Sequence, residues 1–249
     1  MSPRRLLQGQ LAVITAGTAG IGLAIAERFI AEGATVVVTG TSAERADAAA
    51  RRLGPQAHVV ISDAADLEDR AIEEWLRDDG RAVDVLVVNA GRDIASTRIV
   101  DTTPEDFDTV ADLNFRGGFF TLRTVTPLMS DGGRIVLVSS IAGHNGGPGH
   151  AVYNATKAAV RSLARTVTAE LRDRRIRANA VSPGPTDTDG FDQFTGGSAE
   201  FRERIIAQIP VGRVGRADEV AAVVTFLASE ESSFVAGAEI VVDGGMSQV

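Results

Sequence analysis

Short apolar segments rich in β-branched residues alternate along the chain with longer, alanine-rich segments whose apolar positions recur with helical period. Continuous apolar runs of this kind are typical of buried parallel strands, and helices connect such strands. The pattern predicts strands at residues 11–15, 34–39, 58–62, 83–88, 133–139, 177–182 and 239–243. We therefore expect an α/β fold with a doubly wound, seven-stranded parallel sheet and helices on both faces.

No linker, repeat or low-complexity run divides the chain, which predicts a single domain over residues 1–249. The longest irregular stretch covers residues 183–199 and is rich in Gly, Pro, Ser, Thr and Asp. A loop of this length inside a compact domain is usually a lid or a mobile insertion. Because the stretch follows a predicted strand, we favour a substrate lid at about residues 186–209.

Composition narrows the classes of partner. A formal net charge of −8 argues against nucleic acid, because phosphate backbones attract basic faces. The absence of cysteine excludes disulfides and thiolate chemistry. No apolar run approaches the roughly 20 residues of a membrane span, and the N-terminal residues lack the apolar core of a signal peptide. These features predict a cytoplasmic protein that does not bind membranes.

Glycine, asparagine and hydroxyl residues follow six of the predicted strands. Ligands of open α/β sheets bind outside the carboxyl ends of the strands, so these residues are expected to surround one crevice. After the first strand, Gly17, Gly20 and Gly22 precede a helix. Glycine lets the backbone approach a pyrophosphate closely, and the N–H groups at the start of a helix offer it hydrogen bonds. The turn is therefore either a pyrophosphate site or a packing feature.

Tyr153 and Lys157 are the single tyrosine and the single lysine of a chain that has 25 lysine and arginine residues. Residues four apart share a helix face. A phenol with a pKa of about 10 can act as a general acid or base near neutral pH if that pKa falls. A fall of roughly 3 units requires about 4 kcal/mol, which a cation at about 4 Å provides at an effective dielectric of about 20. Lys157 is placed to be that cation.

These features together resemble the short-chain dehydrogenase/reductase family over essentially the whole chain, and the resemblance implies a Rossmann-type fold. Thr15, Gly20 and Gly22 match the family's glycine motif, whereas Ala16 stands at its first glycine. A positive φ there would cost alanine on the order of 1 kcal/mol, unless Gly17 takes over the turn. Three later motifs follow in the family's order, namely NAG at 89–91, SPGPT at 182–186 and DGG at 243–245.

The resemblance implies four catalytic residues. Tyr153 is the general acid and base, and Lys157 adjusts its pKa and donates to ribose hydroxyls. Ser140 precedes Tyr153 by 13 residues and orients the substrate oxygen, while its neighbour Ser139 is the alternative and is better suited to bonding the backbone. Asn114, in the segment LNFRGG, would hold a water that links Lys157 to solvent.

The choice of cofactor depends on the end of the second strand, where an acidic side chain would bind the ribose 2′-OH and repel a 2′-phosphate. Thr41 and Ser42 stand there with Arg45 nearby, so we favour NADP(H) and keep NAD(H) as the alternative. Ala19 weighs against NADP(H), because many relatives that use it carry a basic residue at this place. Val88 departs from the family's Asn-Asn-Ala-Gly motif at the cost of one side-chain hydrogen bond. The resemblance implies these cofactor-binding residues: Thr15, Gly17, Gly20, Ile21, Gly22, Thr41, Ser42, Asp63, Ala64, Asn89, Ala90, Gly91, Tyr153, Lys157, Pro183, Gly184, Thr186 and Thr188.

The substrate is expected between the lid and the loop AGHNGGPGH that precedes Tyr153. His144 and His150 in this loop are either ordinary loop residues or substrate contacts. No metal is expected, because no third ligand occurs at metal-binding spacing. Phe191 and Phe194 would form apolar walls of the site or pack the lid against the body.

We therefore predict an NAD(P)-dependent oxidoreductase that interconverts a ketone or aldehyde and a secondary alcohol. Its partner is a small-molecule substrate, and the resemblance implies a homotetramer. One alternative is a catalytically silent NAD(P)-binding regulatory protein, which would not need Tyr153 and Lys157 on one helix face. Another is an epimerase or dehydratase of the wider superfamily, but these have a larger C-terminal domain than 249 residues allow.

Overall fold

The computed structural model describes residues 5–94 and 96–249. Its main sheet has seven parallel strands in the order β3-β2-β1-β4-β5-β6-β9. This order confirms the predicted α/β Rossmann-type fold. The strands run from β3 down to β1 and then from β4 upward, so the order reverses between β1 and β4. Open α/β sheets bind their ligands at this point of reversal. The strands are β1 (Leu11–Ile14), β2 (Thr35–Gly40), β3 (Ala57–Ile61), β4 (Val83–Val88), β5 (Met129–Val138), β6 (Arg177–Pro183) and β9 (Glu239–Val242).

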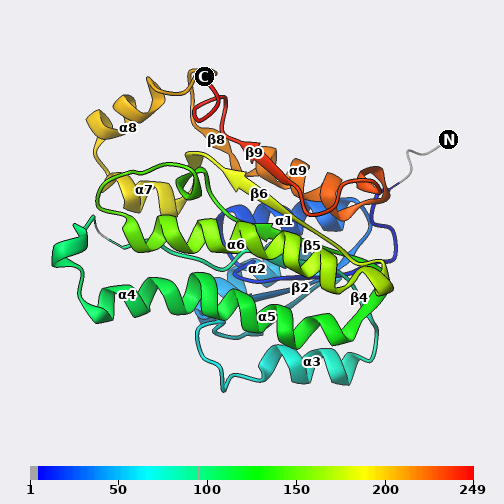
Figure 1. The fold of residues 1–249 in the computed structure, drawn as a ribbon. Coiled ribbons are helices and arrows are strands. Elements are labelled where there is room, and N and C mark those ends of the chain that lie inside the picture. The colour runs from blue at the N-terminus through cyan, green and yellow to red at the C-terminus, as the bar shows by residue number, and fades with distance from the viewer. Residues whose placement is uncertain (1–4, 95) are drawn as a thin grey trace.

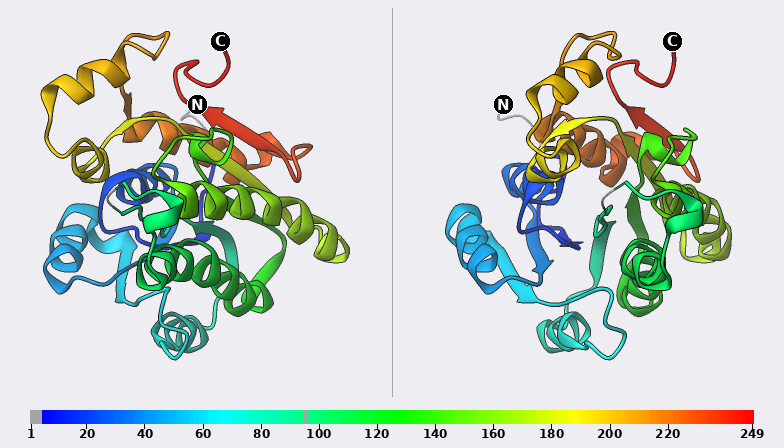
Figure 2. Two further views of the ribbon diagram at one scale, coloured as in Figure 1. Left: turned by 60° about the vertical axis from the view of Figure 1, so that its left-hand side comes forward. Right: turned by 90° about the vertical axis from the view of Figure 1, so that its left-hand side faces the viewer.

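Helices cover both faces of the sheet (Figures 1 and 2). Their packing divides the core into two clusters of buried side chains, one on each face. The first face carries α1 (Gly20–Ala31), α2 (Ala43–Leu53) and α9 (Ala217–Ala228). The second carries α3 (Ala71–Asp79), α4 (Pro104–Ala111), α5 (Gly118–Val125) and α6 (Ala151–Glu170).

The central strands are apolar throughout because both of their faces are buried. In β1, Ala12 and Ile14 belong to the first cluster, whereas Leu11 and Val13 belong to the second. All four residues are at most 2% exposed. Successive side chains of a strand point to opposite faces, so a strand buried on both sides reads as a continuous apolar run.

The stretch 183–199 is not the irregular loop that its composition predicted, because much of it is helical. The segment after β6 forms β7 (Thr186–Asp187), α7 (Asp189–Thr195) and α8 (Ala199–Ile206), and β7 pairs with β8 (Gly215–Arg216). Thr188 and Ser198 cap the two helices with their side-chain oxygens, which favours helix starts among turn-forming residues. A separate small core then holds the helices in place, formed by Phe191, Ile205 and Ile209 with Phe201, Val214 and Met246 packed against it.

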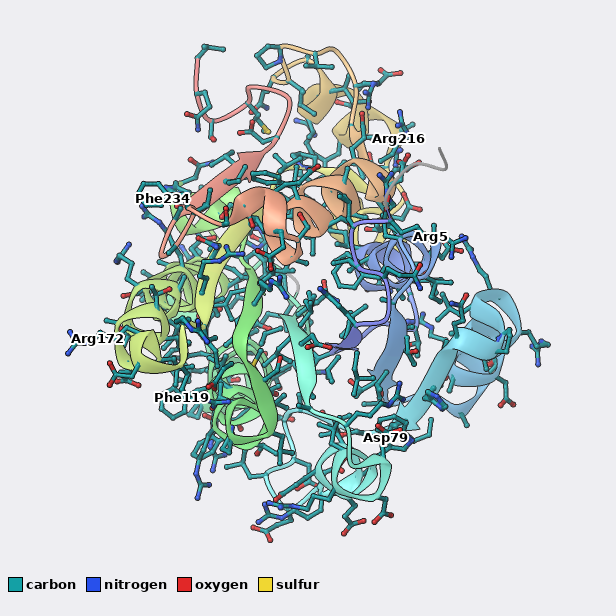
Figure 3. The ribbon with its side chains drawn as sticks, turned by 90° about the vertical axis from the view of Figure 1, so that its right-hand side faces the viewer. Arg5, Asp79, Phe119, Arg172, Arg216 and Phe234 are labelled. Atoms are coloured by element: carbon teal, nitrogen blue, oxygen red, sulfur yellow. The ribbon has the colours of Figure 1, made fainter. Side chains whose placement is uncertain are left out.

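Helices α7 and α8 lie beyond the carboxyl ends of the strands, at the left of Figure 1. Figure 3 shows the molecule from the opposite side and labels two exposed aromatic residues, Phe119 of α5 and Phe234 of the segment before β9. No helix in the described ranges is both long and apolar enough to cross a membrane.

Candidate active site

The turn after β1 has an unusual backbone. Ala16 adopts a φ of 49° and Gly20 a φ of 53°, whereas Gly17 does not have a positive φ. Gly17 therefore does not take over the turn, and Ala16 itself occupies the left-handed region. A Cβ on Gly22 would lie 2.4 Å from the carbonyl oxygen of Ala16 and 2.6 Å from Nδ2 of Asn89. Only glycine at position 22 permits this close approach of backbone segments.

Thr15 and Asn89 tie this turn to the end of β4. The hydroxyl oxygen of Thr15 accepts hydrogen bonds from the N–H groups of Asn89 at 2.9 Å and Ala90 at 3.0 Å. The side-chain amide of Asn89 donates in return to the carbonyl oxygens of Thr15 at 3.0 Å and Ala16 at 3.2 Å. The side chain of Asn89 thus fixes the shape of the turn, a role that the sequence did not reveal.

The turn fits a pyrophosphate. Helix α1 begins at Gly20, and Ala19 before it provides no side-chain cap, so the first N–H groups of the helix have no side-chain acceptor there. Such N–H groups, together with the helix dipole, favour phosphate oxygens. Thr188 lies across from the turn, since a Cβ on Gly20 would be 3.6 Å from its Cγ2 atom. The structure therefore brings together two predicted cofactor-binding segments that are distant in the sequence.

A cleft continues from this turn along the ends of β1, β2 and β3. Its walls include Thr15 and the predicted pair Asp63 and Ala64. The Asp63 carboxylate accepts a hydrogen bond from the N–H of Ala65 at 2.9 Å. A Cβ on Gly117 would lie 2.4 Å from the carbonyl oxygen of Ala64, so the helical segment before α5 packs directly against this wall. The arrangement suits the adenosine half of a dinucleotide.

The end of β2 carries hydroxyl groups and no acidic side chain at residues 40–42. The Ser42 hydroxyl accepts a hydrogen bond from the N–H of Arg45 at 3.3 Å and caps α2. The Arg45 guanidinium is 3.7 Å from the carboxylate of Asp189, the first residue of α7. The end of β2 therefore carries no negative side chain of its own, and the Arg45 guanidinium on α2 is paired with a residue that follows β6.

Helix α6 carries Tyr153 and Lys157 on the second face of the sheet. Lys157 is 5% exposed, and its ammonium nitrogen donates to the carbonyl oxygen of Val138 at 3.1 Å. The same nitrogen is 5.6 Å from the centre of the Tyr153 ring and would be 3.0 Å from a Cβ on Gly91. Lys157, Tyr153 and the NAG segment therefore lie close together. Burial lowers the pKa of Lys157 to about 8.

The pKa of Tyr153 is raised, mainly because burial disfavours the phenolate. A hydrogen bond with Ser140 lowers this pKa, and the negative charge of Asp93 raises it. The direction is opposite to the one expected from a neighbouring cation, because loss of hydration outweighs the favourable contacts. Ser140 and Tyr153 are nevertheless brought together as predicted. The protein holds Tyr153 as a neutral phenol, which is the form that donates a proton to a carbonyl oxygen.

Asn114 lies in a π-helical segment, Asp112–Gly117, between α4 and α5. Its side chain is buried and binds the segment after NAG, donating to the carbonyl oxygen of Arg92 and accepting from its N–H, both at 2.8 Å. The amide also donates to the hydroxyl of Thr156 at 3.3 Å. π-Helical turns occur frequently at functional sites. The side chain of Asn114 thus holds the segment after NAG in place beside Lys157. That Asn114 also holds a water linking Lys157 to solvent stays a prediction.

Ser139 differs from Ser140 in its contacts. Its hydroxyl is buried and donates to the carbonyl oxygen of Lys157 at 2.7 Å. This bond attaches α6 to the end of β5 and sets the position of Lys157. Ser139 therefore has the backbone-binding role expected for it, and Ser140 is the serine beside the phenol.

The segment after β6 reaches both the sheet and the lid. Pro183 ends β6, and a Cβ on Gly184 would lie 2.6 Å from Cβ of Asp243, so the PG and DGG motifs pack against each other. The hydroxyl of Thr186 donates to the carbonyl oxygen of Gly184 at 2.9 Å, and that of Thr188 donates to the carbonyl oxygen of Thr186 at 3.2 Å. These bonds fix the backbone between the sheet and α7.

Helix α7 contacts the start of α6 through aromatic rings. The rings of His150 and Phe194 have centres 5.4 Å apart, and Phe191 stacks with Phe194 at 6.4 Å. Nδ1 of His150 is 2.7 Å from the carboxylate of Asp93, in the segment after NAG. His150, Phe191 and Phe194 therefore form one aromatic cluster at the start of α6. Asp93 contacts this cluster through His150 and also acts on Tyr153, a role that the sequence did not reveal.

His144 has a different environment from His150. Its Nε2 atom is 2.6 Å from the carboxylate of Glu239, at the start of β9. Arg161 and Ser182 bind the same carboxylate. The two histidines of the loop therefore contact different parts of the protein, His144 the start of β9 and His150 the segment after NAG. Within residues 5–94 and 96–249, no group of three or more His, Cys, Asp or Glu side chains is arranged to hold a metal ion.

The fold and site together define a class of protein: a dinucleotide-dependent oxidoreductase of Rossmann type. Comparisons with known proteins agree. A family model described as "Enoyl-(Acyl carrier protein) reductase" matches residues 15–247. The chain therefore belongs to the short-chain dehydrogenase/reductase family and is an NAD(P)-dependent dehydrogenase/reductase.

Three similar proteins show how far the likeness extends. The chain is 41% identical over 254 residues to the oxidoreductase asL5 of Sarocladium schorii, covering 100% of both chains. It is 36% identical to the NADP-dependent (R)-specific alcohol dehydrogenase of Lentilactobacillus kefiri, covering 96% of this chain and 97% of that one. A solved structure described as a short chain dehydrogenase/reductase family protein has a TM-score of 0.88 at 39% identity, over 98% of this chain and 99% of that chain.

Proposed function

We propose that this enzyme interconverts a ketone or aldehyde and a secondary alcohol, and that Tyr153 is its general acid and base. The observation that supports the proposal is that Tyr153 lies beside both Ser140 and Lys157, next to the NAG segment. Reduction adds a hydride to the carbonyl carbon and a proton to its oxygen. A bound nicotinamide supplies or accepts the hydride, and the protein handles the proton.

Each side chain has a defined part in this proton transfer. The Ser140 hydroxyl donates a hydrogen bond to the substrate oxygen and holds it at the phenol. Tyr153 is neutral, so it gives its proton to that oxygen during reduction and takes it back during alcohol oxidation. Lys157 offsets the charge of the phenolate that reduction leaves behind, because its ammonium group lies over the Tyr153 ring.

The nucleotide we propose is NADP(H). Thr41 and Ser42 at the end of β2 carry no charge that would repel a 2′-phosphate, and the Arg45 guanidinium lies within reach of that place. One relative is described as NADP-dependent, which agrees with this choice. Dissociation constants for NADPH and NADH, obtained by titrating nucleotide fluorescence, test it. Tighter binding of NADH would overturn the choice while leaving the reaction class intact.

We propose that the aromatic cluster forms one wall of the substrate site and that α7 and α8 act as a lid. Phe194 is 44% exposed and can contact a substrate together with His150, whereas Phe191 is buried and packs behind Phe194. A mostly apolar wall with few polar groups favours an uncharged small molecule. The Asp93 carboxylate at the same wall disfavours anionic substrates. The contacts of His144 lie with Glu239, so we leave it out of this wall.

The active form we propose is a homotetramer. Phe107, Phe115 and Phe119 of the α4–α5 region are 52%, 37% and 45% exposed, and Phe234 is fully exposed. Large apolar side chains gathered on a surface commonly mark contacts with another protein. Light scattering after size-exclusion chromatography measures the mass directly, and a monomeric mass near 26.1 kDa would refute the assembly.

Tyr153→Phe tests the catalytic assignment. The variant keeps the ring and loses only the proton that the reaction needs, so kcat should fall by about 10³-fold. Dissociation constants for the nucleotide should change by less than about twofold, because the phenol makes a small part of that contact. Activity within tenfold of the parent enzyme would remove Tyr153 from its role. An unmodified protein that binds NADPH yet turns over no carbonyl or alcohol in a broad panel would instead support the silent regulatory alternative.

A further inference from the structure

The lid carries three aspartates near its start, and they differ in their partners. Arg202 of α8 binds both Asp187 and Asp192. Asp189 instead points away from the lid, and its carboxylate is 3.7 Å from the guanidinium of Arg45 on α2. Asp189 is therefore the lid aspartate whose ion pair reaches the cofactor-binding half of the sheet.

The pair joins two segments that are both expected to contact the cofactor. Thr188, the residue before Asp189, faces Gly20 of the pyrophosphate turn. Arg45 lies about one helical turn after Thr41 and Ser42, the residues beside which the ribose 2′-phosphate is proposed to bind. The two charged side chains thus meet next to residues proposed to bind the pyrophosphate and the adenosine ribose, with Asp189 coming from α7 and Arg45 from α2.

The contact between Arg45 and Asp189 is of a kind that can be exchanged. Both side chains are largely in solvent, with 56% and 75% of their surface exposed, and such ion pairs contribute little to stability. A phosphate carries more negative charge than a carboxylate, and it can accept two parallel hydrogen bonds from a guanidinium, whereas the 3.7 Å contact with Asp189 is too long for a hydrogen bond. A 2′-phosphate is therefore a stronger partner for Arg45 than Asp189 is.

We propose that Asp189 is a specificity-determining residue for the cofactor, because its carboxylate competes with the 2′-phosphate of NADP(H) for Arg45. The inference rests on the proposed use of NADP(H). NADP(H) must displace Asp189 and accept its nearby negative charge, whereas NAD(H) leaves the ion pair intact. Asp189 thus weakens the binding of NADP(H) relative to NAD(H), which makes the ratio of the two affinities smaller. It also makes the attachment of the lid to α2 depend on which nucleotide is bound.

The experiment measures dissociation constants of NADPH and NADH, by nucleotide fluorescence at one low ionic strength, for the parent protein and three variants. Asp189→Asn should tighten NADPH by at least about threefold and change NADH by less than about twofold. Asp192→Asn is the matched control, because it removes the same charge from the same helix while its partner is Arg202. It should leave the ratio of the two constants unchanged. Arg45→Gln should weaken NADPH by about tenfold with little effect on NADH.

The variants distinguish a failure of the role of Asp189 from a failure of the proposed use of NADP(H). If Asp189→Asn leaves the ratio unchanged, or shifts it no more than Asp192→Asn does, Asp189 has no special role and the inference fails while NADP(H) use stands. If Arg45→Gln leaves NADPH affinity unchanged, Arg45 does not bind the 2′-phosphate, and the inference falls with that assignment. The gain from Asp189→Asn should also shrink when the salt concentration rises, since the groups involved are exposed.

Discussion

The ammonium nitrogen of Lys157 donates a hydrogen bond to the carbonyl oxygen of Val138 at 3.1 Å, which attaches the middle of α6 to the end of β5. Ser139, the next residue after Val138, returns a bond to the carbonyl oxygen of Lys157 at 2.7 Å. This reciprocal pair holds a nearly fully buried cation beside Tyr153. Burial of a cation opposes folding unless a full counter-charge lies beside it, and a carbonyl oxygen supplies only a partial charge.

Lys157→Met should therefore stabilise the protein without nucleotide while it abolishes activity. The pKa of Lys157 falls from 10.5 to about 8, so unfolded protein binds more protons than folded protein between these values. The cost of burying the charge is complete below pH 8, amounts to about 3 kcal/mol, and disappears as the pH rises toward the unfolded value. We expect the variant to gain about 1–3 kcal/mol in the free energy of unfolding at pH 7.

Urea denaturation from pH 7 to 10.5 checks this expectation. The difference between Lys157→Met and the parent protein should shrink steadily above pH 8, because the parent protein becomes more stable there as the charge is lost. Arg165→Met, an exposed position on the same helix, is the control and should show no such trend. A variant that is less stable than the parent at every pH would contradict the buried-cation account.

Asp93→Asn should move the pH dependence of alcohol oxidation toward lower pH. Oxidation requires the phenolate of Tyr153 as base, and the Asp93 carboxylate raises the pKa of this phenol. Removing the charge lowers that pKa, so the rise of kcat/KM with pH should begin earlier. Asp101→Asn removes an exposed carboxylate that pairs with Arg98 and should leave the profile in place. A shift toward higher pH would have the wrong sign for electrostatic control by Asp93.

Much of the sheet could be predicted because its strands are buried on both faces. A strand such as β4 is apolar at almost every position, so its location follows from composition without knowledge of its neighbours. The start of β5 could not be predicted from the sequence, because residues 129–132 contain Ser, Asp and Gly. They join the sheet because Met129 pairs with Val83. The helices of the lid were missed for a similar reason. They are short, and contacts between residues far apart in sequence, such as Phe191 with Ile205, hold them.

The proposed catalytic residues stand out in the sequence because rare residues occur at fixed intervals on one element and at the ends of strands. Asp93 carries no such signal: it is one of many acidic residues in a loop, and its effect on Tyr153 depends on how the segment after β4 folds back. The structural role of the Asn89 side chain was hidden for the same reason, since its acceptors belong to a turn more than 70 residues earlier.

Thr15→Val should loosen the cofactor turn. The Thr15 hydroxyl is buried and accepts from two backbone N–H groups, which would lose their acceptor. Each unsatisfied buried donor costs about 1–3 kcal/mol, so we expect the free energy of unfolding to fall by about 2 kcal/mol or more. Nucleotide affinity should fall as well, because the turn that the N–H groups hold is the proposed pyrophosphate site. Thr15→Ser keeps the acceptor and should restore both properties; if it behaves like valine, the methyl group matters more than the hydroxyl.

Ala16→Gly tests whether the turn stores strain. The φ of 49° at Ala16 costs an L-residue with a Cβ about 1–2 kcal/mol, and glycine removes this cost but brings greater freedom to the unfolded chain. The net gain in the free energy of unfolding should therefore be at most about 1 kcal/mol, measured by urea denaturation. Arg175→Gly is the matched control, because Arg175 also has a positive φ, of 55°, and is exposed. It belongs to none of the segments that are proposed to bind the nucleotide. Both variants should gain stability, and only Ala16→Gly should change the affinity for NADPH. If Ala16→Gly loses stability while Arg175→Gly gains it, the methyl group of Ala16 makes packing contacts that outweigh the strained backbone.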